Sequence, residues 1–335
     1  MNKQILLVSR PAGEPSEDNF RLVETPIPEP GEGQVLVRNL WLSLDPYMRG
    51  RMSDQKSYAA PQPLGQVMIG GTASEVVDSR HPGFQPGDTV VGTFGWQHYA
   101  LFDGSQRGQV RRVDATRVPL SAYLGAVGMP GVTAWYGLVK VIDPKPGQTV
   151  VVSAASGAVG SVVGQLARLR GARAVGIAGG AEKCRHVVEA LGFDACIDHR
   201  AHPDTASLAS ALEAACPDGI DGDFENVGGR VLDAIMRCIN PFGRIAVCGM
   251  IAGYNGEPIP LADPQRILTQ RLRVQGFIVG EHLEVWPEAL DELGSLVATG
   301  RLVRHESVAE GLENAPAAFF GLLQGRNLGK QLVKL

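Results

Sequence analysis

The segment 154–160 has the residue types that a dinucleotide requires where a strand turns into a helix. It reads Ala154-Ala155-Ser156-Gly157-Ala158-Val159-Gly160. In the G-x-G-x-x-G fingerprint, Gly157 takes the second glycine position, where the backbone approaches a pyrophosphate, and Gly160 takes the third, where the helix packs against the strand. Ala155 replaces the first glycine. Because the amino end of the following helix attracts phosphate, the segment predicts a dinucleotide site.

The residues after the next predicted strand indicate whether the dinucleotide is NAD or NADP. An acidic residue there would hydrogen-bond the ribose 2′-hydroxyl of NAD and repel the 2′-phosphate of NADP. The strand instead ends in Ala178-Gly179-Gly180-Ala181, and Lys183 follows in the first turn of a helix. Lys183 alone could be an ordinary solvated lysine. Because the acid is missing and the helix end favours an anion, the sequence predicts NADP(H).

Tyr254 is the candidate proton donor. It lies in a loop that follows the fifth strand of a predicted parallel sheet, at the edge where such sheets bind ligands. A phenol with a pKa near 10 is protonated at pH 7, so it can stabilise negative charge on a substrate oxygen. The alternative for a lone tyrosine in a glycine-rich loop is packing at the surface.

A metal is not expected to supply that stabilisation. Cysteine is absent before residue 184, and the five cysteines form no CxxC pair. They are expected to be reduced residues of the core. Asp221, Asp223 and Glu225 end a predicted strand and are expected to form a solvated cluster of charges.

Aromatic and sulfur side chains in the first third of the chain are candidates for a substrate wall. Tyr47 and Met48 precede Arg49, and Trp96 and Tyr99 flank His98. Each of these side chains could equally pack in the core, which is the expectation we favour for Trp96 and Tyr99.

Length and composition exclude several classes of protein. The chain has 335 residues, of which 44% are hydrophobic, and no apolar run approaches the roughly 20 residues that span a bilayer. The 31 Lys and Arg against 35 Asp and Glu leave a net charge of −4, without the basic excess of a nucleic-acid binder. The length predicts two domains, and the short apolar run 5–8 is no secretory signal, so we expect a cytoplasmic location.

The elements that position these residues form two patterns. Short apolar runs separated by Pro and Gly turns predict a β-rich first domain, with strands at 5–8, 34–37, 75–77 and 89–91. From residue 149 onward, strands at 149–153, 174–178, 195–198, 221–225, 244–248 and 272–279 alternate with helices at 158–170, 182–191, 205–215 and 230–239. Such alternation predicts an α/β doubly wound, parallel, six-stranded Rossmann sheet.

The last part of the chain has helical patterns at 286–297 and 315–323 and a closing strand at 330–335. We expect it to return to the first domain. The predicted domains are therefore 1–122 completed by 302–335, and 123–301.

Motifs along almost the whole chain closely resemble the leukotriene hydroxydehydrogenase/prostaglandin reductase branch of the zinc-independent medium-chain dehydrogenases/reductases, including bacterial NADP-dependent oxidoreductases. Besides 154–160 and 176–184, the matching segments are 43–50, 128–134, 224–229, 249–251 with Tyr254-Asn255, 275–279 and 327–330. The resemblance implies a GroES-like β domain beside the Rossmann domain, with the active site between them. It also implies NADPH-dependent reduction of the carbon–carbon double bond of α,β-unsaturated ketones and aldehydes, by hydride transfer to the β-carbon without metal.

The resemblance also implies site residues. Tyr254 is the implied catalytic residue, with Tyr47, Met48, Trp96 and Tyr99 as candidates for the substrate side. The implied cofactor-binding residues are Met129, Thr133, Ser156, Gly157, Ala158, Val159, Gly160, Gly179, Lys183, His199, Asn226, Val227, Tyr254, Phe277, Ile278, Val279 and Asn327. His199 departs from the family, in which a tyrosine often packs near the 2′-phosphate, so its role is open.

Relatives in this branch are commonly dimers, which implies a homodimer in which strand 272–279 could pair across the interface. Two other functions remain open: an NADPH:quinone reductase, and an NADPH-binding protein without catalysis. Alcohol dehydrogenation is disfavoured, because the chain lacks the zinc-ligand motifs of the zinc-dependent relatives.

Overall fold

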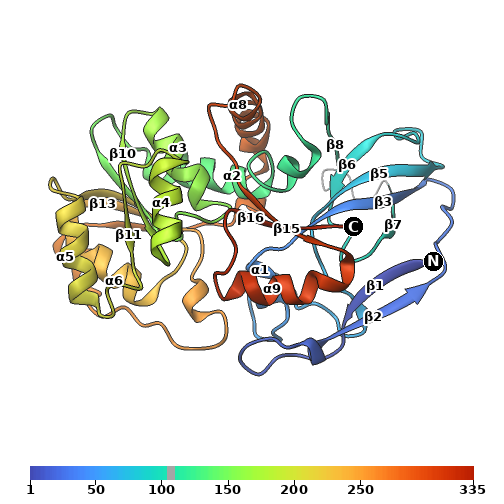
Figure 1. Cartoon of the computed structure of the whole chain (residues 1–335), viewed down its shortest axis with the longest axis horizontal. Coiled ribbons are helices and arrows are strands. Elements are labelled where there is room, and N and C mark those ends of the chain that lie inside the picture. The colour runs from blue at the N-terminus through green and yellow to red at the C-terminus, as the bar shows by residue number, and fades with distance from the viewer. Residues whose placement is uncertain (104–109) are drawn as a thin grey trace. The chain divides into compact units, whose positions relative to one another are not determined.

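The computed structural model describes residues 1–103 and 110–335, which form two compact units (Figure 1). One unit contains Met1–Gly125 and Glu306–Leu335, and the other is the continuous stretch Ala126–His305. The carboxyl-terminal segment therefore belongs to the same unit as the amino-terminal segment. Within the described residues, no helix has both the length and the apolarity to cross a membrane.

The unit Ala126–His305 is built on one parallel sheet. Its strand order is β11-β10-β9-β12-β13-β14, and every neighbouring pair is parallel. The strands are β9 (Thr149–Val152), β10 (Arg173–Ala178), β11 (Ala195–Asp198), β12 (Ile220–Glu225), β13 (Ile239–Val247) and β14 (Arg273–Gly276). The doubly wound six-stranded sheet predicted from the sequence is confirmed.

Helices cover both faces of this sheet. Side chains of α2 (Met129–Tyr136), α3 (Gly160–Leu169), α4 (Ala181–Glu189) and α8 (Trp286–Ala298) share one core with Val150, Val152 and Phe224. On the other face, α5 (Thr205–Ala215) and α6 (Gly229–Cys238) share a second core with Val151, Val175 and Ile245. Because both faces are covered, β9 reads as an unbroken β-branched run in the sequence.

The other unit is mainly antiparallel. One sheet has the order β2-β1-β4, and a seven-stranded sheet has the order β15-β16-β3-β5-β6-β8, with β7 also pairing with β3. The strands are β1 (Asn2–Leu7), β2 (Phe20–Thr25), β3 (Gln34–Ser43), β4 (Gln66–Val67), β5 (Thr72–Ser79), β6 (Thr89–Gly92), β7 (Tyr99–Asp103), β8 (Arg111–Arg112), β15 (Glu306–Glu310) and β16 (Lys330–Lys334). Two helices accompany them, α1 (Tyr47–Arg51) and α9 (Ala315–Leu323).

Two differences from the sequence prediction have physical reasons. Strand β15 was not predicted; it pairs in parallel with β16, and its side chains are only partly buried, so the sequence carries no apolar run there. The sixth strand of the Rossmann sheet ends at Gly276 rather than at 279, because Phe277 and Val279 turn into the core.

A buried ion pair joins the two chain ends within their shared unit. The Lys330 ammonium lies 2.8 Å from Asp45 Oδ1 and donates to the carbonyl oxygen of Leu44 at 2.6 Å. The Ser43 hydroxyl donates to the other carboxylate oxygen of Asp45. Because a buried charge is costly without a partner, this pair fixes β16 against the turn that leads into α1.

Candidate active site at the carboxyl edge of the parallel sheet

The turn between β9 and α3 brings two backbone segments unusually close together. A Cβ placed on Gly160 would lie 2.5 Å from the carbonyl oxygen of Ala154, so only glycine fits there. Ala154 itself adopts a left-handed conformation, with φ of 49°. At Gly157, a Cβ would meet only the Ala154 carbonyl oxygen, at 3.2 Å, which leaves the backbone open on its other side. This arrangement fits a pyrophosphate at the amino end of α3.

The neighbouring strand compensates for the missing first glycine of the fingerprint. Ala155 is fully buried, and its Cβ points toward β10 at Gly176, where an added Cβ would lie only 2.8 Å away. The methyl group of Ala155 therefore occupies space that a side chain on β10 would otherwise fill. The signal in the sequence is Gly176, within the otherwise apolar run 174–178 of this strand.

Positively charged side chains gather where β10 ends. An added Cβ on Gly179 would lie 3.0 Å from both Arg200 Nε and His199 Nε2. Arg230, at the start of α6, donates to the carbonyl oxygen of His199 at 3.2 Å, and its guanidinium lies 3.5 Å from His199 Nδ1. Sequence analysis missed Arg200 and Arg230; only the position of Arg200 directly after strand 195–198 pointed toward them.

This basic cluster shifts the titration of its own members. Burial lowers the pKa of Lys183, and the charge of Arg200 lowers it further. Burial also lowers the pKa of His199 below its usual 6.5, and the charges of Arg230 and Arg200 lower it further. His199 is therefore neutral at pH 7, and the positive charge of the cluster comes from Lys183 and the two arginines.

An acid at the end of β11 is engaged by backbone groups. Asp198, at the end of β11, accepts hydrogen bonds from the amides of Gly180 at 2.8 Å and Arg200 at 2.9 Å. Burial alone would raise its pKa, but these hydrogen bonds lower it below the usual value. Its carboxylate thus joins the loop after β10, at Gly180, to the loop after β11, at Arg200.

At the end of β12, Glu225 organises the loop that carries Asn226 and Val227. Its Oε1 accepts hydrogen bonds from the Ser153 hydroxyl at 2.8 Å, from the Gly228 amide at 2.8 Å and from the Val227 amide. The Asn226 side chain donates to the carbonyl oxygen of Ser153 at 2.8 Å. The loop after β12 is therefore tied to the end of β9, next to the dinucleotide turn.

The prediction of a solvated charge cluster at 221–225 was wrong for two of its three acids. Asp223 and Glu225 are 0% exposed, and neither carboxylate oxygen of Asp223 has a hydrogen-bond partner. Burial raises the pKa of both carboxyls, and Glu225 raises that of Asp223 further. Asp223 lies on β12, which is covered on both faces. The acidic residues of this strand made it look exposed in the sequence. Asp221 alone is half-buried, and it accepts a hydrogen bond from the Thr149 amide.

The structure brings Tyr254 beside Asn226. An added Cβ on Gly249 would lie 3.0 Å from the Tyr254 hydroxyl oxygen and 3.4 Å from the Asn226 carbonyl oxygen. Both residues thus border Gly249, just beyond the carboxyl end of β13. Tyr254 is half-buried and follows a short 3₁₀ turn, Ile251–Gly253. The predicted proton donor therefore lies at the ligand-binding edge of the sheet.

Other predicted cofactor residues occupy this unit in different environments. The Thr133 hydroxyl donates to the carbonyl oxygen of Met129 one helical turn earlier, at 2.7 Å. Phe277 and Val279 are buried in the core, where Phe277 packs against Tyr136 and Phe224. Of the three residues 277–279, only Ile278 has a half-exposed side chain.

The predicted substrate-side residues belong to the unit that contains the chain ends. Met48 and Trp96 are 0% exposed within its core, and Trp96 stacks on Phe20. Neither side chain therefore presents a surface to a ligand, and core packing is what the structure shows for Trp96. Tyr47 and Tyr99 are half-buried.

Asn327 also lies in the unit of the chain ends, just before β16. Its side-chain amide donates to the carbonyl oxygen of Gly329 at 2.7 Å.

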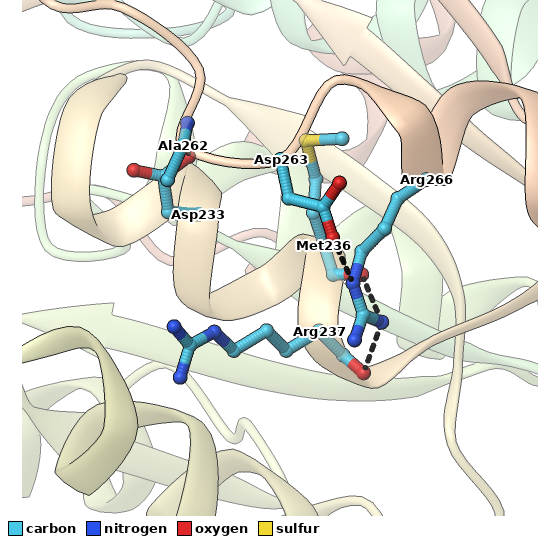
Figure 2. Close-up of a pocket in the computed structure, with 6 residues that line it drawn as sticks. All are labelled: Asp233, Met236, Arg237, Ala262, Asp263 and Arg266. Atoms are coloured by element: carbon cyan, nitrogen blue, oxygen red, sulfur yellow. Dashed lines mark hydrogen bonds and ion pairs between the residues drawn. The ribbon is translucent and has the colours of Figure 1, made fainter.

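A separate pocket of about 230 Å³ opens between α6 and the segment 262–266, which leads into α7 (Gln265–Thr269) (Figure 2). In it, the Arg266 guanidinium donates to the carbonyl oxygens of Met236 and Arg237 and lies 3.4 Å from Asp263. These bonds cap the carboxyl end of α6. None of the predicted site residues lines this pocket.

Comparison with known proteins identifies the family. Residues 3–110 match the family model described as the N-terminal domain of oxidoreductase, and residues 158–295 match the one described as zinc-binding dehydrogenase. The chain is 48% identical to NADPH-dependent curcumin reductase of Escherichia coli (strain K12), covering 100% of this chain and 97% of that protein. It is 41% identical to 2-alkenal reductase (NADP(+)-dependent) of Nicotiana tabacum, covering 99% and 97%. The chain is a zinc-independent medium-chain dehydrogenase/reductase of the alkenal and enone reductase branch.

A solved structure of this fold agrees closely. CurA from Vibrio vulnificus in complex with NADPH superposes with a TM-score of 0.91 at 44% identity, covering 99% of this chain and 98% of that one. Despite the description of the second family model, residues 1–103 and 110–335 of this reductase hold no group of three His, Cys, Asp or Glu side chains placed to bind a metal.

Asp223→Asn tests the buried protonated carboxyl of this reductase. Above about pH 4 the unfolded chain loses the Asp223 proton while the folded protein retains it, so wild-type stability falls by up to about 1.4 kcal/mol per pH unit until the folded pKa is reached. An asparagine carries no such proton. The free energy of unfolding of the variant relative to wild type should therefore rise by about 2 kcal/mol or more between about pH 4.5 and pH 7.5. Urea denaturation at both pH values measures this difference, and an equal difference at both would contradict a raised pKa.

Proposed function

We propose that this reductase reduces the carbon–carbon double bond of α,β-unsaturated ketones and aldehydes, by hydride transfer to the β-carbon and without a metal. The observation that carries the proposal is the Tyr254 hydroxyl beside Gly249 and Asn226, at the same sheet edge as the dinucleotide turn. The printed names of two relatives, a curcumin reductase and a 2-alkenal reductase, support it.

The enzyme is an NADP-dependent oxidoreductase, and NADP(H) is its cofactor, which supplies the hydride when bound. The residues of the chain fit this group. The open backbone at Gly157 and the close approach at Gly160 provide a cradle for its pyrophosphate. We assign this contact to Ser156, Gly157, Ala158, Val159 and Gly160.

The basic cluster at Gly179 fits the 2′-phosphate. His199 and Arg200 lie beside Gly179, the charge of Arg200 acts on Lys183, and Arg230 holds the backbone of His199. In this proposal neutral His199 donates a hydrogen bond, whereas Lys183 and Arg200 supply charge.

Further along the cofactor, the proposal assigns Asn226, Val227, Met129, Thr133 and the segment 277–279 to its nicotinamide half, with the backbone rather than the side chains of Phe277 and Val279 facing it. Asn327 is also assigned to the cofactor in this proposal. On the substrate side, the half-buried Tyr47 and Tyr99 remain candidates.

Tyr254 is proposed to act on the substrate oxygen. As hydride reaches the β-carbon, negative charge develops on the carbonyl oxygen, and the phenol donates a hydrogen bond to it. The tie between Asn226 and Ser153 keeps the neighbouring loop fixed while this charge develops. Because the donor is already in place, little reorganisation is needed at the moment of reaction.

Tyr254→Phe should lower turnover with an alkenal or enone by about a hundredfold, since removal of one oxyanion donor costs roughly 2.7–4 kcal/mol in comparable sites. Turnover is measured as loss of NADPH absorbance across a panel of enones, alkenals and quinones. The control is Tyr123→Phe, whose hydroxyl donates to the carbonyl oxygen of Asp114 instead. A fall of less than about threefold would remove Tyr254 from this role. Turnover confined to the quinones would replace the proposed reaction by quinone reduction, and NADPH binding without any turnover would replace it by a non-catalytic role.

Arg200→Ala should raise the dissociation constant for NADPH about tenfold or more and leave that for NADH unchanged, because a hydrogen bond to a charged group contributes about 1.5–3 kcal/mol. Fluorescence titration with both cofactors measures the selectivity. Arg185→Ala is the matched control, since Arg185 is an exposed arginine on α4, the helix that also carries Lys183. Equal weakening of NADPH and NADH by Arg200→Ala would place the 2′-phosphate elsewhere.

We also propose a homodimer. Strand β14 is the last strand of its sheet, and Val274 on it is 43% exposed, as is typical of an edge available for pairing. Light scattering of the purified protein distinguishes a dimer from a monomer.

We also propose a cytoplasmic location. The five cysteines are free thiols, and proteins of reducing compartments rarely carry lasting disulfides. Cell fractionation tests this location.

A further inference from the structure

The loop that carries Tyr254 is hydrogen-bonded to the loop that follows β12. The amides of residues 248, 249, 251 and 252 donate to the carbonyl oxygens of Glu225, Asn226 and Val227, at 2.9–3.1 Å. The Tyr254 amide in turn donates to the carbonyl oxygen of Ile251, at 3.2 Å. The backbone that leads to the tyrosine is therefore held against the backbone of 225–227.

The Ile259 side chain adds a packing contact between the same two loops. An added Cβ on Gly228 would lie 2.9 Å from Ile259 Cδ1, and one on Gly253 would lie 3.1 Å from the same atom. Because neither glycine has a side chain, one isoleucine can pack against both loops. Gly253 directly precedes Tyr254, so this contact reaches the neighbour of the tyrosine.

The Glu225 side chain anchors the loop on which the Tyr254 loop rests. Its Oε1 accepts hydrogen bonds from the Ser153 hydroxyl and from the amides of Val227 and Gly228. The Ser153 hydroxyl in turn accepts a hydrogen bond from the Asn226 amide at 2.7 Å. Burial raises the pKa of Glu225, and the hydrogen bonds that it accepts counter that effect. Three successive amides are thus bound to two buried side chains.

We propose that Glu225, itself 0% exposed, is a positioning residue for the reaction, because it holds the Tyr254 hydroxyl in place through the loop 226–228. At the far end of this connection the hydroxyl lies against Gly249, where an added Cβ would be 3.0 Å from its oxygen. Displacement of a reacting group by about 1 Å can lower a rate about a hundredfold. The inference rests on the role proposed for Tyr254.

Glu225→Gln should lower the turnover of an enone at saturating NADPH about tenfold or more, because a neutral amide oxygen accepts hydrogen bonds more weakly than a carboxylate and the loop loosens. The same change made on Tyr254→Phe should lower turnover less than about twofold, since the hydroxyl that it misplaces is already gone. A double-mutant cycle over the two positions measures this difference. Equal losses in both backgrounds would overturn the proposal, because Glu225 would then act by another route.

Asp223→Asn is the matched control, since Asp223 is also 0% exposed on β12 but its carboxyl oxygens have no hydrogen-bond partner. It should change turnover less than about twofold. A loss equal to that of Glu225→Gln would overturn the proposal, because any change of a buried acid on β12 would then suffice. Unchanged turnover in the single variant Tyr254→Phe would remove the proposed function together with this inference, whereas equal losses in the cycle remove the inference alone.

Hydrogen exchange followed by mass spectrometry tests the same connection without any substrate. The amides of 248–252 should exchange about tenfold faster in Glu225→Gln than in wild type or in Asp223→Asn, because their carbonyl partners lie in the loop that Glu225 anchors. Unchanged exchange in Glu225→Gln would overturn the proposal, whichever substrate the enzyme reduces.

Gly249→Ala is the second variant, which keeps the proposal testable if Glu225→Gln does not fold. Its Cβ would lie 3.0 Å from the Tyr254 hydroxyl oxygen, so the hydroxyl has to move while the Glu225 carboxylate keeps its hydrogen bonds. Turnover at saturating NADPH should fall about tenfold, but less than about twofold when the change is made on Tyr254→Phe. Unchanged turnover in Gly249→Ala would overturn the proposal, because the exact place of the hydroxyl would then not matter.

Discussion

The contact between Gly160 and the carbonyl oxygen of Ala154 is the constraint on which the site depends. A Cβ on residue 160 would lie 2.5 Å from that oxygen. Because Gly160 has none, α3 can begin close against the end of β9. Its amino end is then held at the carboxyl edge of the sheet, where the helix dipole favours a phosphate. The two strands on either side of β9 place further groups assigned to the cofactor, Gly179 after β10 and Asn226 after β12.

The buried glutamate Glu225 transmits that placement to the next loop. It joins Ser153 at the end of β9 to the amides of Val227 and Gly228 after β12. The same loop carries Asn226, whose carbonyl oxygen lies beside Gly249 together with the Tyr254 hydroxyl. Burying the Glu225 carboxyl costs free energy, because burial opposes its ionisation. In return, three hydrogen bonds to one of its oxygens fix the loop in a single conformation.

Local patterns in the sequence predicted the features that depend on near neighbours. The alternation of β-branched runs and helical stripes predicted the parallel sheet, and the spacing of Gly157 and Gly160 predicted the turn. Features that depend on distant neighbours were not predictable in this way. Arg230 on α6 contacts His199, which follows β11, and Asp223 is buried although its strand reads as acidic. For Met48 and Trp96, residue type alone could not distinguish a core position from a ligand wall.

The Asp45–Lys330 pair and the β16–β3 pairing also set an order on folding during synthesis. The nucleotide-binding unit is continuous in the sequence, so all of its strands have left the ribosome once residue 305 has emerged. The seven-stranded sheet begins with β3, before the nucleotide-binding unit, but its strand β16 follows the whole of that unit in the sequence. Until Lys330 has been synthesised, Asp45 lacks this partner, so the unit that is begun first is completed after the other one.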